Sequence, residues 1–99
     1  MLKISIIDGR THRRLVLEGK LVEPWVDELR PAWERAKAEL AGRQLVMDVK
    51  NLIVISQAGE NVLLELMQEG VKIRGCGVFT RRVLKELARR VEKKDKERY

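Results

Sequence analysis

The fold depends above all on residues 44–70, which read QLVMDVKNLIVISQAGENVLLELMQEG. The run Gln44–Val49 is largely apolar, as expected for the central strand of a sheet that has crossover helices. A second apolar cluster, Leu52–Ile55, follows it. Ser56 then stands where a helix N-cap belongs, because its hydroxyl can accept a backbone N–H of the first helical turn. The stretch therefore predicts a buried strand and then a helix.

The helix after Ser56 has an apolar stripe and a defined end. Its apolar residues recur at helical spacing: Val62, Leu63, Leu66 and Met67. Gly70 suits the left-handed backbone that commonly terminates a helix. Val71 and Ile73 then alternate with charged residues, which predicts a further strand that ends at Gly75–Gly77. A last helix is predicted from its cap and its apolar positions: Thr80, Val83, Leu84, Leu87 and Val91.

Two strands are predicted before the central one. Residues 2–6 alternate apolar and polar side chains, and Asp8 and Gly9 follow them, which is typical of a strand entering a hairpin. Residues 14–18 alternate again, and Gly19 closes that run. We expect these two strands to pair antiparallel.

A helix is predicted from Pro24 to Gly42. Apolar residues recur there at spacings of three or four, and proline suits the first helical position. Pro31 lies within the run and removes a backbone donor, so we expect either a kink near Asp27–Leu29 or a short first segment followed by a restart. The two tryptophans fall on one face, where we expect core packing rather than stacking on a ligand.

These elements predict an α/β fold with one domain. Two antiparallel strands come first, followed by helix, strand, helix, strand and helix, so the sheet has four strands and is mixed. Right-handed crossovers between successive parallel strands place the helices mainly on one face of the sheet. We expect residues 1–92 to form the domain and residues 93–99 to form a charged C-terminal tail.

One face of the sheet should be apolar and the other polar. The covered face is predicted to hold Leu2, Ile4, Ile6, Leu15, Leu17, Leu45, Met47, Val49, Val71 and Ile73. The other face is predicted to hold Lys3, Ser5, Arg14, Glu18, Asp48, Lys72 and Arg74. Val16 and Val46 are exceptions, because they share the polar face; we expect the tail or a partner to cover them.

The charge is unevenly distributed along the chain. The net charge is +6, residues 51–70 contain no lysine or arginine, and the last third is strongly basic. A basic segment can bind nucleic acid by releasing counterions, but such binding usually recruits aromatic side chains, and only 4% of the residues are aromatic. We therefore expect a solvated basic end and no nucleic-acid partner, with binding through residues 81–98 as the alternative.

The N-terminal residues show no basic leader, long apolar segment or cleavage site, and no apolar run approaches the length of a membrane span. We therefore expect a cytoplasmic protein. Cys76 is the single cysteine, so an internal disulfide and a cysteine metal cluster are both excluded.

The sequence contains few side chains that could act in catalysis. His12 is the only histidine and falls in the predicted hairpin, and the only serines are Ser5 and Ser56. No glycine-rich phosphate loop and no metal-ligand spacing occurs, so we expect no enzyme activity, no cofactor and no metal. Asp48 is a ligand-loop candidate, because it lies near the predicted end of the central strand, where α/β sheets often bind ligands. The alternative for Asp48 is an outward-facing or loop-bonding carboxylate.

The order of these motifs resembles the STAS domain family, named for sulphate transporters and anti-sigma factor antagonists. The segment Leu15–Leu21 looks like the family's second strand, the central strand ends near Asp48, and Ala58–Gly59 matches the start of the following helix. In typical anti-sigma factor antagonists a serine before that glycine is phosphorylated by a partner kinase. Here Ala58 stands at the phosphoacceptor position and has no hydroxyl, so the resemblance implies a module without that switch. Ser56 is the alternative phosphoacceptor, although its role as a helix cap is better supported.

The resemblance implies a non-enzymatic, bacterial protein-interaction module involved in signalling and the regulation of transcription. The expected partner is an anti-sigma factor or another signalling protein. Its contact surface is predicted at Ser56, Gln57, Ala58, Glu60 and Asn61. Glu65 and Glu69 should extend this surface with an acidic side that steers a basic partner. The alternatives are a STAS module that senses a nucleotide or lipid, and an accessory subunit of a transporter complex.

Overall fold

The computed structural model describes residues 1–75 and 85–91 of this chain. Its four-stranded sheet has the order β1-β2-β3-β4. The strands are β1 (Leu2–Asp8), β2 (His12–Leu21), β3 (Gln44–Ile55) and β4 (Lys72–Arg74). β1 is antiparallel to β2, and the other two pairings are parallel. The predicted α/β fold with a mixed sheet is confirmed.

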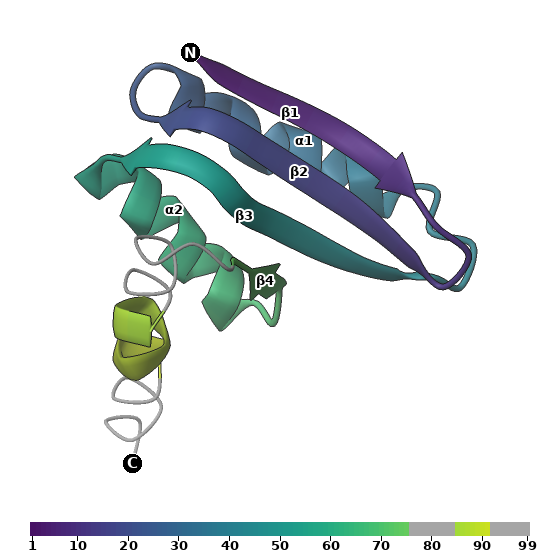
Figure 1. The fold of residues 1–99 in the computed structure, drawn as a ribbon. Coiled ribbons are helices and arrows are strands. Elements are labelled where there is room, and N and C mark those ends of the chain that lie inside the picture. Colours follow the sequence, from purple (N-terminus) through teal and green to yellow (C-terminus); the bar gives the residue numbers. More distant parts are fainter. Residues whose placement is uncertain (76–84, 92–99) are drawn as a thin grey trace.

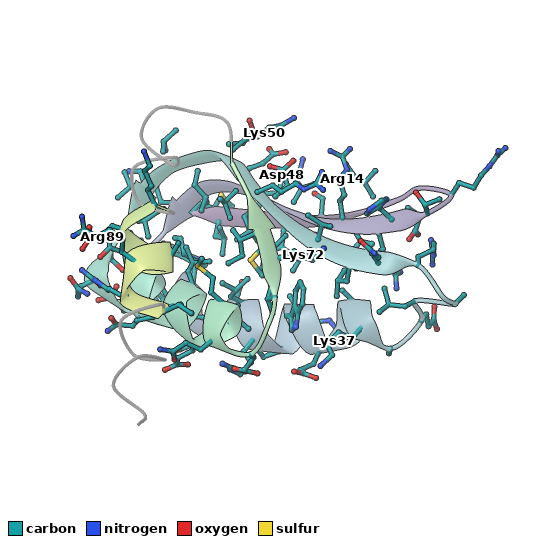
Figure 2. All side chains as sticks on the ribbon, turned by 90° about the horizontal axis from the view of Figure 1, so that it is seen from below. Arg14, Lys37, Asp48, Lys50, Lys72 and Arg89 are labelled. Carbon is teal, nitrogen blue, oxygen red and sulfur yellow. The ribbon has the colours of Figure 1, made fainter. Side chains whose placement is uncertain are left out.

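The helices lie on one side of the sheet. They are the 3-10 helix η1 (Trp25–Glu28), α1 (Leu29–Lys37) and α2 (Gln57–Gln68), and residues 85–91 are also helical. Figure 1 shows α1 running along β1 and β2, and α2 alongside β3. Figure 2 shows the strands above and the helices below, as right-handed crossovers require.

β2 and β3 are both longer than the sequence pattern predicts. β2 continues through Gly19 to Leu21, because Gly19 has φ 95° and an added Cβ would lie only 2.5 Å from the carbonyl oxygen of Met1. Because it has no side chain, Gly19 leaves room for the backbone of Met1 beside β2. The predicted end of the strand at Gly19 is therefore wrong. β3 likewise passes Val49 and runs to Ile55. Two register shifts between β2 and β3 accommodate its extra residues.

The helical region after Pro24 consists of a short first segment and a second helix, which is one of the two predicted alternatives. η1 gives way to α1 at Leu29, so Pro31 falls in the first turn of α1, where its missing N–H costs no hydrogen bond. The helix ends at Lys37, five residues before the predicted end at Gly42.

The core lies between the sheet and the helices. Its fully buried side chains include Leu15, Leu17, Met47, Leu63 and Leu66. Trp33 is only 6% exposed and Trp25 packs against the same cluster, which confirms the core role of both tryptophans. Leu87 is 1% exposed, so the helical residues 85–91 also contribute to the core. Ile6, expected on the covered face, is instead 42% exposed near the end of β1.

Val16 and Val46 are 5% and 2% exposed in the single chain. No second chain is therefore needed to cover them. The predicted cap Thr80, the apolar positions Val83 and Leu84, and the tail 93–99 lie outside the described residues. Within residues 1–75 and 85–91, no helix is long and apolar enough to cross a membrane.

Candidate functional site

The start of α2 is fixed to the sheet by Ser56. This residue has an extended backbone, and its Oγ accepts a hydrogen bond from the N–H of Gly59 at 3.2 Å, so the predicted N-cap is confirmed. Its backbone N–H donates to the carbonyl oxygen of Leu21 at 3.0 Å. The last residue of β2 thereby holds the point where β3 turns into α2.

Ser56 has a third partner that the sequence did not indicate. Its hydroxyl donates to Oε1 of Glu23 at 2.6 Å, a short charge-assisted bond. This bond, with a backbone hydrogen bond at Glu23, lowers the pKa of the Glu23 carboxyl below its usual value. Glu23 lies 33 positions earlier in the chain, so no local pattern could reveal the contact.

Gly59 lets α2 approach the sheet closely. A Cβ at this position would lie 2.6 Å from the carbonyl oxygen of Leu21 and about 3 Å from side-chain carbons of Leu21 and Ile55. Any larger residue would push the helix away from the ends of β2 and β3. Ala58 beside it is half-buried and packs against the core. The Ala58–Gly59 pair therefore has a packing role.

The outer side of this helix start is open to solvent. Gln57 and Asn61 are exposed, and Nε2 of Gln57 donates to Oδ1 of Asn61 at 3.2 Å. Glu60 is partly exposed. Ile53 and Val54 come just before and are 67% and 41% exposed.

We call these six residues the α2-start surface: Ile53, Val54, Ser56, Gln57, Glu60 and Asn61. The two aliphatic members were not among the predicted contact residues, because residues 52–55 were recognised only as an apolar cluster. The sequence did contain a sign of this exposure. Consecutive strand residues face opposite sides of a sheet, so four apolar residues in a row cannot all enter one core. Exposed aliphatic side chains beside polar ones are typical of a protein-contact surface.

The acidic side of α2 is partly neutralised by α1. Arg30 of α1 donates to Glu65 at 3.2 Å and to Glu69 at 2.9 Å. These bonds lower the pKa of Glu69 and raise that of Arg30. Both carboxylates are exposed, as expected, and Arg30 offsets part of their negative charge. The sequence between residues 51 and 70 lacks cations, but α1 supplies one from outside it.

Asp48 lies in the middle of β3, away from any loop. It is 7% exposed, and its Oδ1 accepts the backbone N–H of Lys50 at 3.0 Å. Its Oδ2 lies 3.5 Å from Nη1 of Arg14 and 4.0 Å from Nζ of Lys50. Figure 2 shows this group on the sheet face opposite the helices. The predicted position of Asp48 at the end of the strand is wrong, because β3 continues to Ile55.

His12 and Ser56 do not come together in the described part of the chain. His12 begins β2 opposite Gln44, whereas Ser56 follows the other end of β3. His12 contacts Thr11, whose Oγ1 lies 2.8 Å from its Nδ1. Among the described residues no group of three or more His, Cys, Asp and Glu could hold a metal ion.

One cleft of about 400 Å³ lies at the far end of α2. Its lining includes Trp33, Lys37, Arg43, Glu69 and Lys72. The cleft is lined by none of the five predicted contact residues at the start of α2 and not by Asp48, although Glu69, expected to extend that surface, is part of its lining.

No protein-family model matches this chain, and a search of the curated proteins found no relative.

Proposed function

We propose that this chain is a non-enzymatic, STAS-like protein-interaction module in bacterial regulation, which resembles an anti-sigma factor antagonist without the phosphorylation site. The observation that carries the proposal is the α2-start surface. It joins two exposed aliphatic side chains of β3 to exposed polar side chains of α2. The partner is an anti-sigma factor or another signalling protein.

The rigid mounting of this surface supports a docking role. Ser56 ties the helix start to Leu21 and Glu23, and Gly59 packs it onto the sheet. A surface held in one shape loses little conformational entropy when a partner binds. Ile53 and Val54 supply apolar area, and Gln57 and Asn61 supply hydrogen-bonding groups that set specificity.

The environment of Ser56 argues against phosphate transfer to it. Its hydroxyl hydrogen is given to Glu23, and its oxygen accepts from Gly59. A phosphate there would carry nearly two negative charges beside the Glu23 carboxylate, and the two would repel. Ala58 offers no hydroxyl either. The proposed module therefore docks constitutively.

The separation of the chemical groups supports the non-enzymatic part of the proposal. A nucleophile requires a base within hydrogen-bond reach. Ser56 contacts a carboxylate whose pKa is lowered, which makes Glu23 a weaker base than usual. His12 lies at the opposite end of the two central strands.

The test is affinity capture from the source cells, with mass spectrometry to identify the partner and calorimetry to measure its binding. Gln57→Arg combined with Glu60→Lys places two new positive charges on the α2-start surface. We expect this variant to weaken partner binding at least about tenfold, or roughly 1.4 kcal/mol.

The matched control is Gln68→Arg with Glu34→Lys, which makes the same charge change at exposed positions elsewhere on the helices. It should retain full binding, and both variants should keep the thermal midpoint of the wild type within a few degrees. Equal binding of the Gln57/Glu60 variant and the wild type would contradict the proposed surface.

A further inference from the structure

The face of the sheet opposite the helices carries a patch of positive charge. Strand alternation and the register place six lysines and arginines on it: Lys3, Arg14, Lys20, Lys50, Lys72 and Arg74. All six are exposed. Only two carboxylates share the described part of this face, Glu18 and the nearly buried Asp48. Figure 2 shows Arg14, Asp48 and Lys50 gathered on this side.

The helical side is close to neutral. Its carboxylates are Asp27, Glu28, Glu34, Glu60, Glu65, Glu69 and Glu86. The same helices carry as positive groups Arg30, Arg35, Lys37, Lys85, Arg89 and Arg90. Among the described residues the sheet face therefore has the larger excess of positive charge, although the sequence places the most basic segment at its C-terminal end.

We propose that this basic sheet face is a second docking surface, which binds an extended acidic segment of a protein partner that also contains aliphatic residues. Charge complementarity is the first argument, since four more positive than negative groups face one side. The six cations lie outside the α2-start surface, and the two proposed surfaces share only Val54.

The aliphatic residues at the two ends of the patch indicate that the bound segment also contains apolar side chains. Ile7 lies opposite Arg14 and is 44% exposed, and Val54 lies opposite Lys20 and is 41% exposed. A segment that mixes carboxylates and aliphatic side chains can pair with the cations and cover both ends. A phosphate backbone offers no apolar group to these residues.

Two observations favour a protein segment over nucleic acid. Trp25 and Trp33 belong to the core on the helical side, and the described part of the sheet face holds no aromatic side chain on which a base could stack. Asp48 also holds Arg14 and Lys50 from within the patch, at 3.5 and 4.0 Å, so part of the positive charge is already compensated.

The test is fluorescence anisotropy of labelled probes at about 0.1 M salt, where exposed charges still interact over roughly 10 Å. The acidic probe is a short peptide of alternating glutamate and valine. A glutamate–serine peptide of equal length and charge measures the aliphatic contribution. The two remaining probes are a short DNA duplex and vesicles containing phosphatidylserine, which test whether other polyanions bind the same face.

The diagnostic variant is Lys20→Glu with Lys72→Glu, since neither lysine has an ion pair within the described residues. The matched control is Arg35→Glu with Lys37→Glu on α1, which lowers the net charge equally. We expect the glutamate–valine peptide to bind the wild type more tightly than the other probes do. Its affinity should fall about tenfold in the diagnostic variant and stay unchanged in the control.

Three results would overturn the proposal. One is tighter binding of the DNA duplex or of the vesicles than of the peptide, which would make the face a general polyanion surface. Another is an equal loss of peptide affinity in both variants. The third is no detectable peptide binding by the wild type, provided that its circular dichroism shows the folded protein.

Discussion

Ser56 shows how much one residue can organise in this fold. Its hydroxyl caps α2 through Gly59 and donates to Glu23, and its backbone N–H holds the end of β2. The cap follows from local sequence, because a serine before an apolar helical repeat is a common helix start. The Glu23 contact does not, because it joins residues that only the folded sheet brings together.

Ser56→Ala removes both side-chain bonds. We expect a loss of about 1 kcal/mol in the free energy of unfolding from the missing cap, measured by urea denaturation at neutral pH. Gln57→Ala is the control, because the neighbouring side chain is exposed and bonds only within α2. A stability equal to that of the wild type would show that the cap is not stabilising.

The same variant should also change the pH dependence of stability. The pKa of Glu23 is lowered in the folded state, so its ionised form stabilises the fold above the usual carboxyl pKa of 4.5, and this contribution is lost as the pH falls through the folded pKa. The gap between wild type and Ser56→Ala should therefore narrow at acidic pH. A gap of constant size would argue against the Ser56–Glu23 bond.

At the scale of the element, β3 combines two environments in one strand. Met47 and Val49 are fully buried under the helices, whereas Asp48 between them faces the other side with Arg14 and Lys50. Alternation predicted this split correctly. The length of β3 was not predictable, because Lys50 and Asn51 read as a strand end, whereas in the sheet they occupy a region of shifted register beside β2.

Substitutions at two adjacent residues of β3 should separate the two faces. Met47→Ala leaves a cavity in the core and should cost about 2–5 kcal/mol of unfolding free energy. Asp48→Asn keeps an acceptor for the N–H of Lys50 and loses only two long ion pairs, so we expect a change of about 1 kcal/mol or less. Chemical denaturation of both variants measures this, and equal losses would contradict the assigned faces.

At the scale of the whole molecule, charge and chemistry are segregated. The helical side is close to neutral, the sheet face is basic, and the α2-start surface lies at one end of the sheet. The cleft at the other end of α2 is lined by Lys37, Arg43 and Lys72; it lies apart from the α2-start surface and shares Lys72 with the basic sheet face.

The nucleotide- and lipid-sensing alternative makes a different prediction for the whole molecule. A ligand that binds only the folded state raises its thermal midpoint by mass action. Under the docking proposal we expect ATP, GTP and phospholipid head groups to leave the midpoint unchanged in a thermal-shift assay. A midpoint that rises with ligand concentration would favour the sensing function, and Lys37→Gln would then test whether the cleft is involved.

The sequence by itself determined the order of the elements, the mixed sheet, the side of the helices and the cap of α2. Each of these depends on local periodicity, on residues with special backbone geometry or on the fixed hand of crossover connections. Tertiary structure alone decided the length of β3, the pairing of Arg30 with α2 and the Ser56–Glu23 bond. Those features join residues far apart in the chain, and their energies depend on distances that exist only once the sheet has formed.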